Sequence, residues 1–159
     1  MTVTARHTRP GEGVRLEMPD GAHIVRASAE DTGGAFEVFE VEAAAGPSTP
    51  LHRSPWGGAL YLLEGSLRIR FEDGQIDLTP GSLIAIPGQT AFTFDVLSES
   101  ARFLGVTGGD RAGKFFADFA ASVPAGRPFE EVFPQVAAVT SRHGVSVQAR
   151  RESVDANRV

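Results

Sequence analysis

Short apolar segments separated by turn-forming pairs fill the first two thirds of this 159-residue chain. Most are rich in Val, Ile, Leu and Phe, and several alternate apolar with polar residues. They occupy residues 22–27, 36–43, 59–71, 75–79, 82–87, 91–96 and 101–107. Pairs such as Asp20-Gly21 and Asp73-Gly74 stand between them. Evenly spaced short strands joined by turns predict an all-β sandwich or barrel.

The pattern becomes helical after residue 107. Residues 111–123 place three phenylalanines at helical spacing, and Pro124 then ends the segment. Residues 129–143 form a second helical candidate, which Pro134 either interrupts or starts. We expect these helices to pack on the outside of the barrel or over its mouth.

A chain of 159 residues is long enough for one domain with a sizeable core and too short for two comfortable ones. We expect an N-terminal arm over residues 1–20, a barrel over 21–107 and a helical segment over 108–148. The polar residues 149–159 are expected to form a frayed tail.

Composition excludes several classes of function. Apolar residues make up 42% of the chain and charged residues 22%, which is typical of a globular domain. The net charge is -5 and no basic stripe exists, so nucleic acid is not an expected partner. The chain has no cysteine, which excludes thiolate catalysis and disulfides. Without a signal peptide or an apolar run of membrane-spanning length, we expect a cytoplasmic protein with no membrane partner.

Residues 108–114 match the Gly-x4-Gly-Lys pattern of a phosphate-binding loop. Such a loop continues with Ser or Thr, whose hydroxyl binds magnesium, and here Phe115 follows. We therefore expect an ordinary loop and helix start.

Residues 46–65 and 80–94 resemble the two motifs of the cupin superfamily. The first motif reads Gly, five residues, His, one residue, His, three or four residues, Glu, six residues, Gly. The second reads Gly, five residues, Pro, one residue, Gly, two residues, His. The matching positions are Gly46, His52, Gly65, Gly81 and Pro87.

The chain is similar to the small single-domain cupins related to quercetin dioxygenase over roughly residues 20–148. The resemblance implies a cupin barrel, which is a double-stranded β-helix or jelly roll, followed by two helices. Small cupins usually pair through strand edges and N-terminal segments, so it also implies a homodimer.

The resemblance implies a metal site, but most of the residues at its ligand positions in this chain are not metal ligands. A cupin metal is held by the two histidines and the glutamate of the first motif and the histidine of the second. Position by position, His52 is retained, while Ser54, Gly58 and Phe92 stand at the other three places. A transition metal needs about three or four protein donors. We therefore expect no metal and no other cofactor; a metal-dependent dioxygenase is the alternative if the motif aligns differently.

Strand alternation from His52 predicts which side chains face the barrel interior. The expected ligand-binding residues are Ser54, Gly58, Leu60, Leu62, Ile84, Ile86, Phe92 and Phe94, with Trp56 at the rim. Glycine in place of a ligand carboxylate is expected to open space at position 58. An apolar cavity with one imidazole and one hydroxyl suits an apolar or aromatic small molecule.

His52 and Glu40 are the candidate catalytic residues. Imidazole titrates near neutral pH and so suits a general acid or base. The alternatives for His52 are a relict hydrogen-bonded inside the barrel or a ligand-binding group. Residues 36–43 do not alternate cleanly, so the direction of Glu40 stays open between the barrel interior, where it would partner His52, and the exposed face.

Three functions remain open on these residues. The first, narrowly favoured over the second, is a metal-independent enzyme that isomerises, dehydrates or cyclises its substrate by acid–base chemistry. The second is a non-catalytic binding protein that carries, senses or sequesters an apolar ligand. The third is an accessory cupin whose barrel is plugged by Phe92, Phe94 and Leu62.

Overall fold

A computed structural model describes residues 4–46 and 49–148; the expected tail at 149–159 lies outside this part. The strands are β1 (Val14–Met18), β2 (Gly21–Ala27), β3 (Phe36–Ala44), β4 (His52–Arg53), β5 (Gly58–Glu64), β6 (Leu67–Phe71), β7 (Gln75–Leu78), β8 (Leu83–Ile86), β9 (Phe92–Val96), β10 (Ser100–Gly108) and β11 (Ser146–Val147). The helices are α1 (Arg111–Ser122) and α2 (Phe129–His143). The all-β barrel with two C-terminal helices predicted from the sequence is confirmed.

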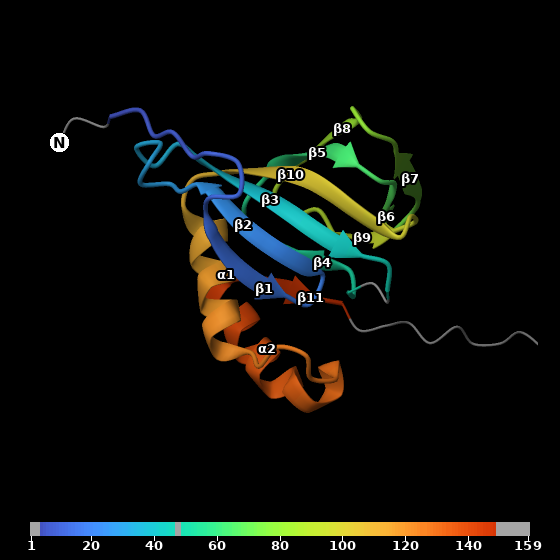
Figure 1. The fold of residues 1–159 in the computed structure, drawn as a ribbon. Helices are drawn as coiled ribbons and strands as arrows, with labels where there is room; N and C mark the ends of the chain where they lie inside the picture. The colour runs from blue at the N-terminus through green and yellow to red at the C-terminus, as the bar shows by residue number, and fades with distance from the viewer. Residues whose placement is uncertain (1–3, 47–48, 149–159) are drawn as a thin grey trace, which may run out of the picture.

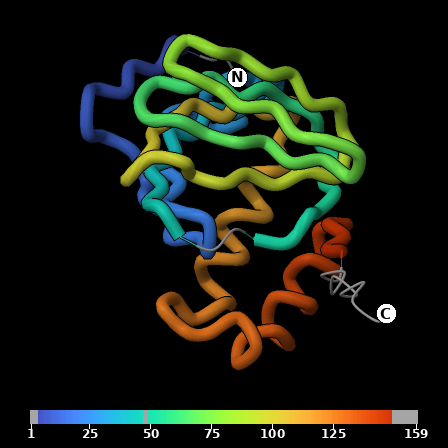
Figure 2. Tube along the Cα trace, turned by 90° about the vertical axis from the view of Figure 1, so that its right-hand side faces the viewer, coloured from blue at the N-terminus to red at the C-terminus, as the bar shows by residue number. Residues whose placement is uncertain are grey.

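The strands form two antiparallel sheets that enclose the core (Figure 1). One sheet has the order β1-β2-β3-β10-β5-β8 and the other the order β11-β4-β9-β6-β7. Val41, Leu62 and Phe103 from the first sheet pack in one buried cluster with Leu67 and Ile69 from the second. Both helices lie together at one end of this barrel (Figure 2).

The structure adds strands that the pattern of apolar segments did not predict. β1 lies within the residues expected as an N-terminal arm, and it pairs with β2 from Val14↔Val25 to Met18↔Gly21. The two-residue strand β4 pairs with β11, and it carries His52 opposite Phe92 of β9. These pairings fix the chain at the turn between β1 and β2 and next to His52.

Helix α2 runs through Pro134 instead of starting or breaking there. It begins after Pro128, which stands at the N-cap, and ends at Gly144 in the left-handed conformation with φ 69°. Pro134 has no N–H to donate to the carbonyl four residues earlier. The helix therefore lacks one backbone hydrogen bond within its first two turns. No helix among residues 4–46 and 49–148 is long and apolar enough to cross a membrane.

A carboxylate from the barrel caps the N-terminus of α1. Glu37 is buried on β3, and its Oε2 accepts a hydrogen bond of 2.8 Å from the backbone N–H of Gly113. A side chain at residue 113 would collide with this carboxylate, which explains the glycine. The protein's own anion therefore holds the helix N-terminus, in agreement with an ordinary helix start instead of a phosphate loop.

Asp118 on α1 ties the two helices together. It accepts hydrogen bonds from Arg142 Nη2 at 3.0 Å and Arg142 Nε at 3.1 Å, and His143 Nε2 lies at 2.8 Å. Ser122 of its own helix donates a further bond of 2.9 Å. Bonds from Arg142, and then from His143 and Ser122, hold the pKa of the Asp118 carboxyl well below its usual range.

Asp118→Asn is expected to destabilise the protein near neutral pH and to flatten the acid side of its stability profile. A carboxyl whose pKa is depressed by folding stabilises the native state above its unfolded pKa of about 3.9, and this contribution is lost as pH falls through the folded value. The measurement is chemical unfolding of both proteins from about pH 7 to about pH 3. Asp73→Asn in an exposed turn is the matched control. Equal unfolding free energies of Asp118→Asn and wild type at every pH would contradict the assignment.

Candidate functional site

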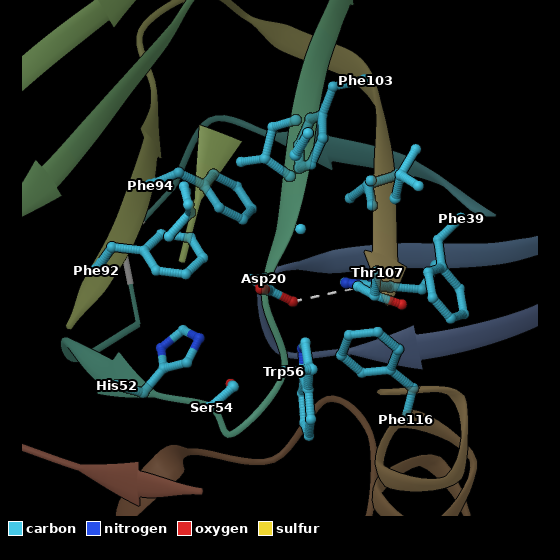
Figure 3. A pocket seen from close by; sticks show the side chains of 18 of the residues that line it. Asp20, Phe39, His52, Ser54, Trp56, Phe92, Phe94, Phe103, Thr107 and Phe116 are labelled. Carbon is cyan, nitrogen blue, oxygen red and sulfur yellow. Dashed lines mark ion pairs between the residues drawn. The ribbon is translucent and has the colours of Figure 1, made fainter. Parts of the chain in front are cut away.

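An apolar cavity of about 120 Å³ lies inside the barrel next to helix α1 (Figure 3). Aromatic rings border it from both sheets and from the helix: Phe39 of β3, Phe103 of β10, Phe92 and Phe94 of β9, and Phe116 of α1. Cavities of similar size lined by apolar side chains stay dry and hold benzene. The barrel cavity is therefore large enough for a ring and is not plugged by its own phenylalanines.

Most of the predicted ligand-binding residues border this cavity. They are Ser54, Trp56, Gly58, Leu60, Ile86, Phe92 and Phe94, and His52 borders it with them. The indole of Trp56 packs against α1, with ring centroids 5.5 Å from Phe115 and 6.3 Å from Phe116. Trp56 thus joins the barrel rim to the helix that covers it. Binding of a ligand by these residues remains a prediction.

Leu62 and Ile84 have the predicted strand phase but do not border the cavity. Leu62 is fully buried and packs in the core cluster with Leu67 and Ile69. Ile84, opposite Leu60 in the sheet, packs against the same cluster. Alternation gives the face of a strand but not the depth along the barrel, so the assignment of these two residues to the site is corrected.

The backbone fixes the tautomer of His52. Nδ1 lies 3.1 Å from the carbonyl oxygen of Pro50, which can only accept, so Nδ1 carries the hydrogen. In the neutral ring the lone pair is then on Nε2, and no hydrogen bond among the described residues engages that atom. The ring centroid of Phe92 lies 5.5 Å away. His52 therefore offers an unengaged acceptor at the edge of an apolar cavity.

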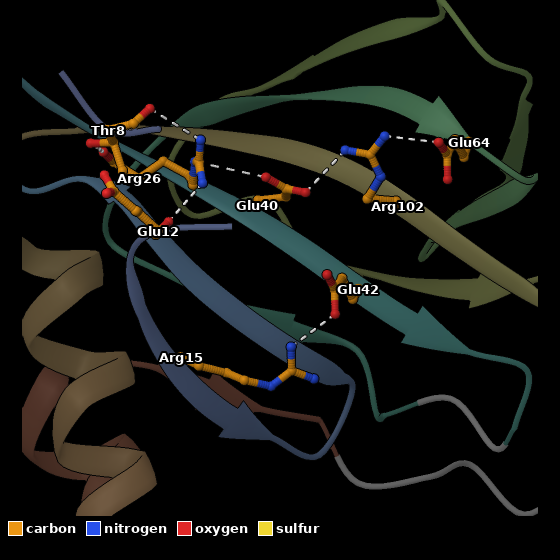
Figure 4. Close-up of polar contacts among 8 residues, drawn as sticks. All are labelled: Thr8, Glu12, Arg15, Arg26, Glu40, Glu42, Glu64 and Arg102. Carbon is orange, nitrogen blue, oxygen red and sulfur yellow. Dashed lines mark hydrogen bonds and ion pairs between the residues drawn. The ribbon is translucent and has the colours of Figure 1, made fainter. Parts of the chain in front are cut away.

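Glu40 lies outside the barrel, which corrects the expectation that it partners His52 (Figure 4). Its neighbours Phe39 and Val41 are buried, so the alternation of β3 directs Glu40 to the outer face. There it accepts a hydrogen bond of 3.0 Å from Arg102 and lies 3.8 Å from Nε of Arg26. Its carboxylate is paired across strands and does not border the cavity.

Asp20 and His23 border the cavity although the sequence pattern did not single them out. Asp20 Oδ1 is buried, finds no hydrogen-bond partner within residues 4–46 and 49–148, and lies 4.0 Å from His23 Nδ1. The Asp20 side chain is 21% exposed as a whole, so its accessible surface belongs to its other atoms. His23 is buried, with Nδ1 3.3 Å from the Gly21 carbonyl oxygen and its ring 4.7 Å from that of Phe116. The i,i+3 spacing of an acid and a histidine across a hairpin turn was the available signal.

No protein-family model matches this sequence. Over 97 residues the chain is 29% identical to quercetin 2,3-dioxygenase of Bacillus subtilis, a match that covers 60% of this chain and 29% of that protein. The polyketide cyclase RemF of Streptomyces resistomycificus shares the fold with a TM-score of 0.59 and 23% identity, over 66% of this chain and 80% of RemF. The cupin domain of Cnp3 from Schizosaccharomyces pombe gives a TM-score of 0.52 at 14% identity, over 64% and 72% of the two chains. The chain has the cupin fold.

The positions that match the metal ligands of the cupin motifs do not form a site that fits a transition metal here. The phenyl ring of Phe92 stands beside His52, and carbon supplies no donor atom. A Cβ at Gly58 would collide with the carbonyl oxygen of Val106, so β10 occupies the direction that a ligand side chain would need. Among the residues described, no three His, Asp or Glu side chains are grouped to hold a metal ion.

The collision at Gly58 also corrects the expectation that this glycine opens ligand space. A β-carbon there meets the backbone of Val106 on the neighbouring strand, which no side-chain rotation can relieve. The glycine instead permits the close approach of β5 and β10 beside the cavity.

Gly58→Ala is expected to lower the free energy of unfolding by about 1–3 kcal/mol, the usual effect of overpacking. Gly74→Ala is the matched control, because a Cβ at Gly74 meets nothing within 4 Å. Urea unfolding of the two variants and wild type measures the difference. If Gly58→Ala is as stable as Gly74→Ala, the two strands are not held as closely as described.

Proposed function

We propose that this cupin is a metal-independent enzyme that acts on an apolar or aromatic small molecule by acid–base chemistry. The observation that carries the proposal is the unengaged Nε2 of His52 at the edge of an apolar cavity large enough for an aromatic ring. Asp20 on the border of the same cavity supplies the carboxylate that Glu40 does not.

In the proposed reaction, Nε2 of His52 removes a proton from the substrate, and the bond from Nδ1 to the Pro50 carbonyl keeps the ring oriented for this step. The His52 imidazolium then returns this proton at a second position of the substrate, or to its departing hydroxyl group, so that the ring ends neutral. The Asp20 carboxylate on the border of the same cavity offsets the positive charge of the imidazolium between the two transfers. The aromatic walls exclude water and hold the substrate in place. Isomerisation, dehydration and cyclisation move protons without net electron transfer, so these groups are sufficient for such a step.

The similar proteins support this class of reaction unequally. RemF is described as a polyketide cyclase, which agrees with proton-transfer chemistry on an aromatic or polyketide-like molecule. The relative from Bacillus subtilis is a dioxygenase, and a metal-dependent oxygenation would need donors that Ser54, Gly58 and Phe92 do not provide. We therefore favour cyclase, dehydratase or isomerase chemistry.

A non-catalytic binding protein is the second candidate, because the cavity is mostly aromatic and aliphatic. In that case His52 donates or accepts one hydrogen bond to a carried or sequestered ligand. The two candidates differ in whether the bound molecule is changed.

We also propose a homodimer. Leu83 is 62% exposed on the edge strand β8 and pairs with Tyr61, which is 40% exposed. An exposed apolar edge of this kind is usually covered by another chain. A molecular mass from light scattering that equals the mass of one chain would contradict the homodimer.

His52→Ala is expected to lower turnover by about 10²–10⁴-fold, the usual contribution of a positioned acid or base. The assay uses the first compound converted in a screen of phenolic and polyketide-like aromatics. Asp20→Asn is expected to lower turnover as well. His7→Ala, outside the cavity, is the matched control. Binding that survives in His52→Ala while wild type converts nothing would instead favour the binding protein.

A further inference from the structure

A second apolar hollow, of about 80 Å³, lies between the barrel and the two C-terminal helices. We call it the helix hollow. Its walls include Met18 of β1, Phe119 of α1, Val136 of α2 and Val147 of β11. Nothing in the proposed acid–base chemistry at the barrel cavity requires such a space.

The hydroxyl groups that border the helix hollow are already engaged within the protein. Thr140 Oγ1 donates to the Val136 carbonyl oxygen at 2.9 Å, as the buried side chain of a helix does. Thr49 Oγ1 and Thr93 Oγ1 lie 3.0 Å apart and bond to each other. Apart from His52 and Asp20, which also border the barrel cavity, the described lining of the hollow therefore offers a ligand no hydroxyl that lacks a partner, and this suits a hydrocarbon better than a polar chain.

Exposed apolar side chains stand at the rim of the helix hollow. Phe129 is 36% exposed and Val147 is 38% exposed, and both border it. The ring of Phe129 lies 5.8 Å from that of Phe133, which is 52% exposed. Apolar surface gathered beside a hollow indicates a place where another apolar group binds.

The helix hollow and the barrel cavity share four bordering residues: Asp20, His52, Phe115 and Phe116. Two of these are the titratable groups proposed for the reaction, and the other two are rings of α1. His52 and Asp20 therefore border both spaces.

We propose that the two hollows form one binding site for an aromatic molecule that carries an apolar side arm. The ring occupies the barrel cavity and the arm occupies the helix hollow. The atoms that join ring and arm then lie beside His52 and Asp20. This inference rests on the proposed function for its chemistry, but the binding of the arm is measured without turnover.

The test compares binding of 4-methylphenol and 4-butylphenol, two molecules that differ by three methylene groups. Trp56 is the only tryptophan of the chain and borders the barrel cavity, so its fluorescence reports occupancy there. Each buried methylene contributes up to about fourfold in affinity. We expect 4-butylphenol to bind wild type roughly 10- to 50-fold more tightly than 4-methylphenol.

Val147→Phe, which fills the helix hollow, is expected to reduce this preference to about twofold or less while the affinity for 4-methylphenol stays within about twofold of wild type. Val14→Phe is the matched control, because Val14 is an exposed strand valine that borders neither space, and it is expected to keep the full preference. Phe129→Ala, which removes part of the wall, is expected to lower the preference too. Thermal unfolding shows that each variant is folded.

The proposal of one site formed by the two hollows would be overturned by equal affinities of the two phenols for wild type. It would also be overturned if both Val147→Phe and Phe129→Ala kept the full preference for 4-butylphenol. Either result would leave the proposed function standing. If neither phenol binds wild type, this inference and the aromatic substrate class of the proposed function are both wrong. If both phenols bind as expected but His52→Ala leaves turnover unchanged, only the proposed catalysis is wrong.

Discussion

The phenyl ring of Phe92 packs against the imidazole of His52 on paired strands, with 5.5 Å between their centroids. The cupin motifs have a metal-binding histidine at each of these two positions, and here the second position holds a phenyl ring without a donor atom. Phe94 and Phe103, whose centroids are 5.2 Å apart, extend the same apolar surface. Hydrogen bonds and charges act more strongly in such a water-poor cavity than in bulk water. The replacement of a ligand by a phenyl ring thus gives the remaining histidine a different environment in which to act.

The barrel cavity depends on helix α1 as much as on the strands. Phe115 and Phe116 of this helix border it, and Trp56 packs against both rings. Two carboxylates hold the helix in this position: Glu37 caps its N-terminus, and Asp118 joins it to α2. His143, which contacts Asp118, also lies with its ring centroid 5.6 Å from that of Phe115. Contacts at the N-terminus of α1 and between the two helices therefore support the wall of the site.

The sequence predicted the fold well because its main signals are local. Apolar alternation, turn pairs and helical spacing predicted the long strands and both helices. The resemblance to the cupin motifs predicted that His52, Gly58 and Phe92 face one interior space, and all three border the barrel cavity. The positions that sequence could not settle depend on contacts between distant residues. Glu37 faces inward because it caps a helix 76 residues later, and this burial of an acid obscured the alternation that sends Glu40 outward.

The sequence also did not predict how deep Leu62 lies in the barrel or where the hairpin of β1 and β2 is placed. Leu62 follows the phase of Leu60, yet it lies in the core beyond the end of the cavity. The Asp20-Gly21 pair predicted a turn, but nothing local showed that Asp20 borders the same cavity as Trp56. Its position follows from the pairing of β1 with β2 and of β2 with β3, which brings Asp20 and His23 to the cavity.

We propose that an apolar cavity beside His52 takes the place of the metal site of the cupin barrel. Elemental analysis of protein purified without a metal-affinity column or a chelator tests it most directly. We expect well under one transition metal per chain, together with activity or aromatic binding that added chelator does not change. One transition metal per chain, with function lost when it is removed and restored when it is returned, would contradict it.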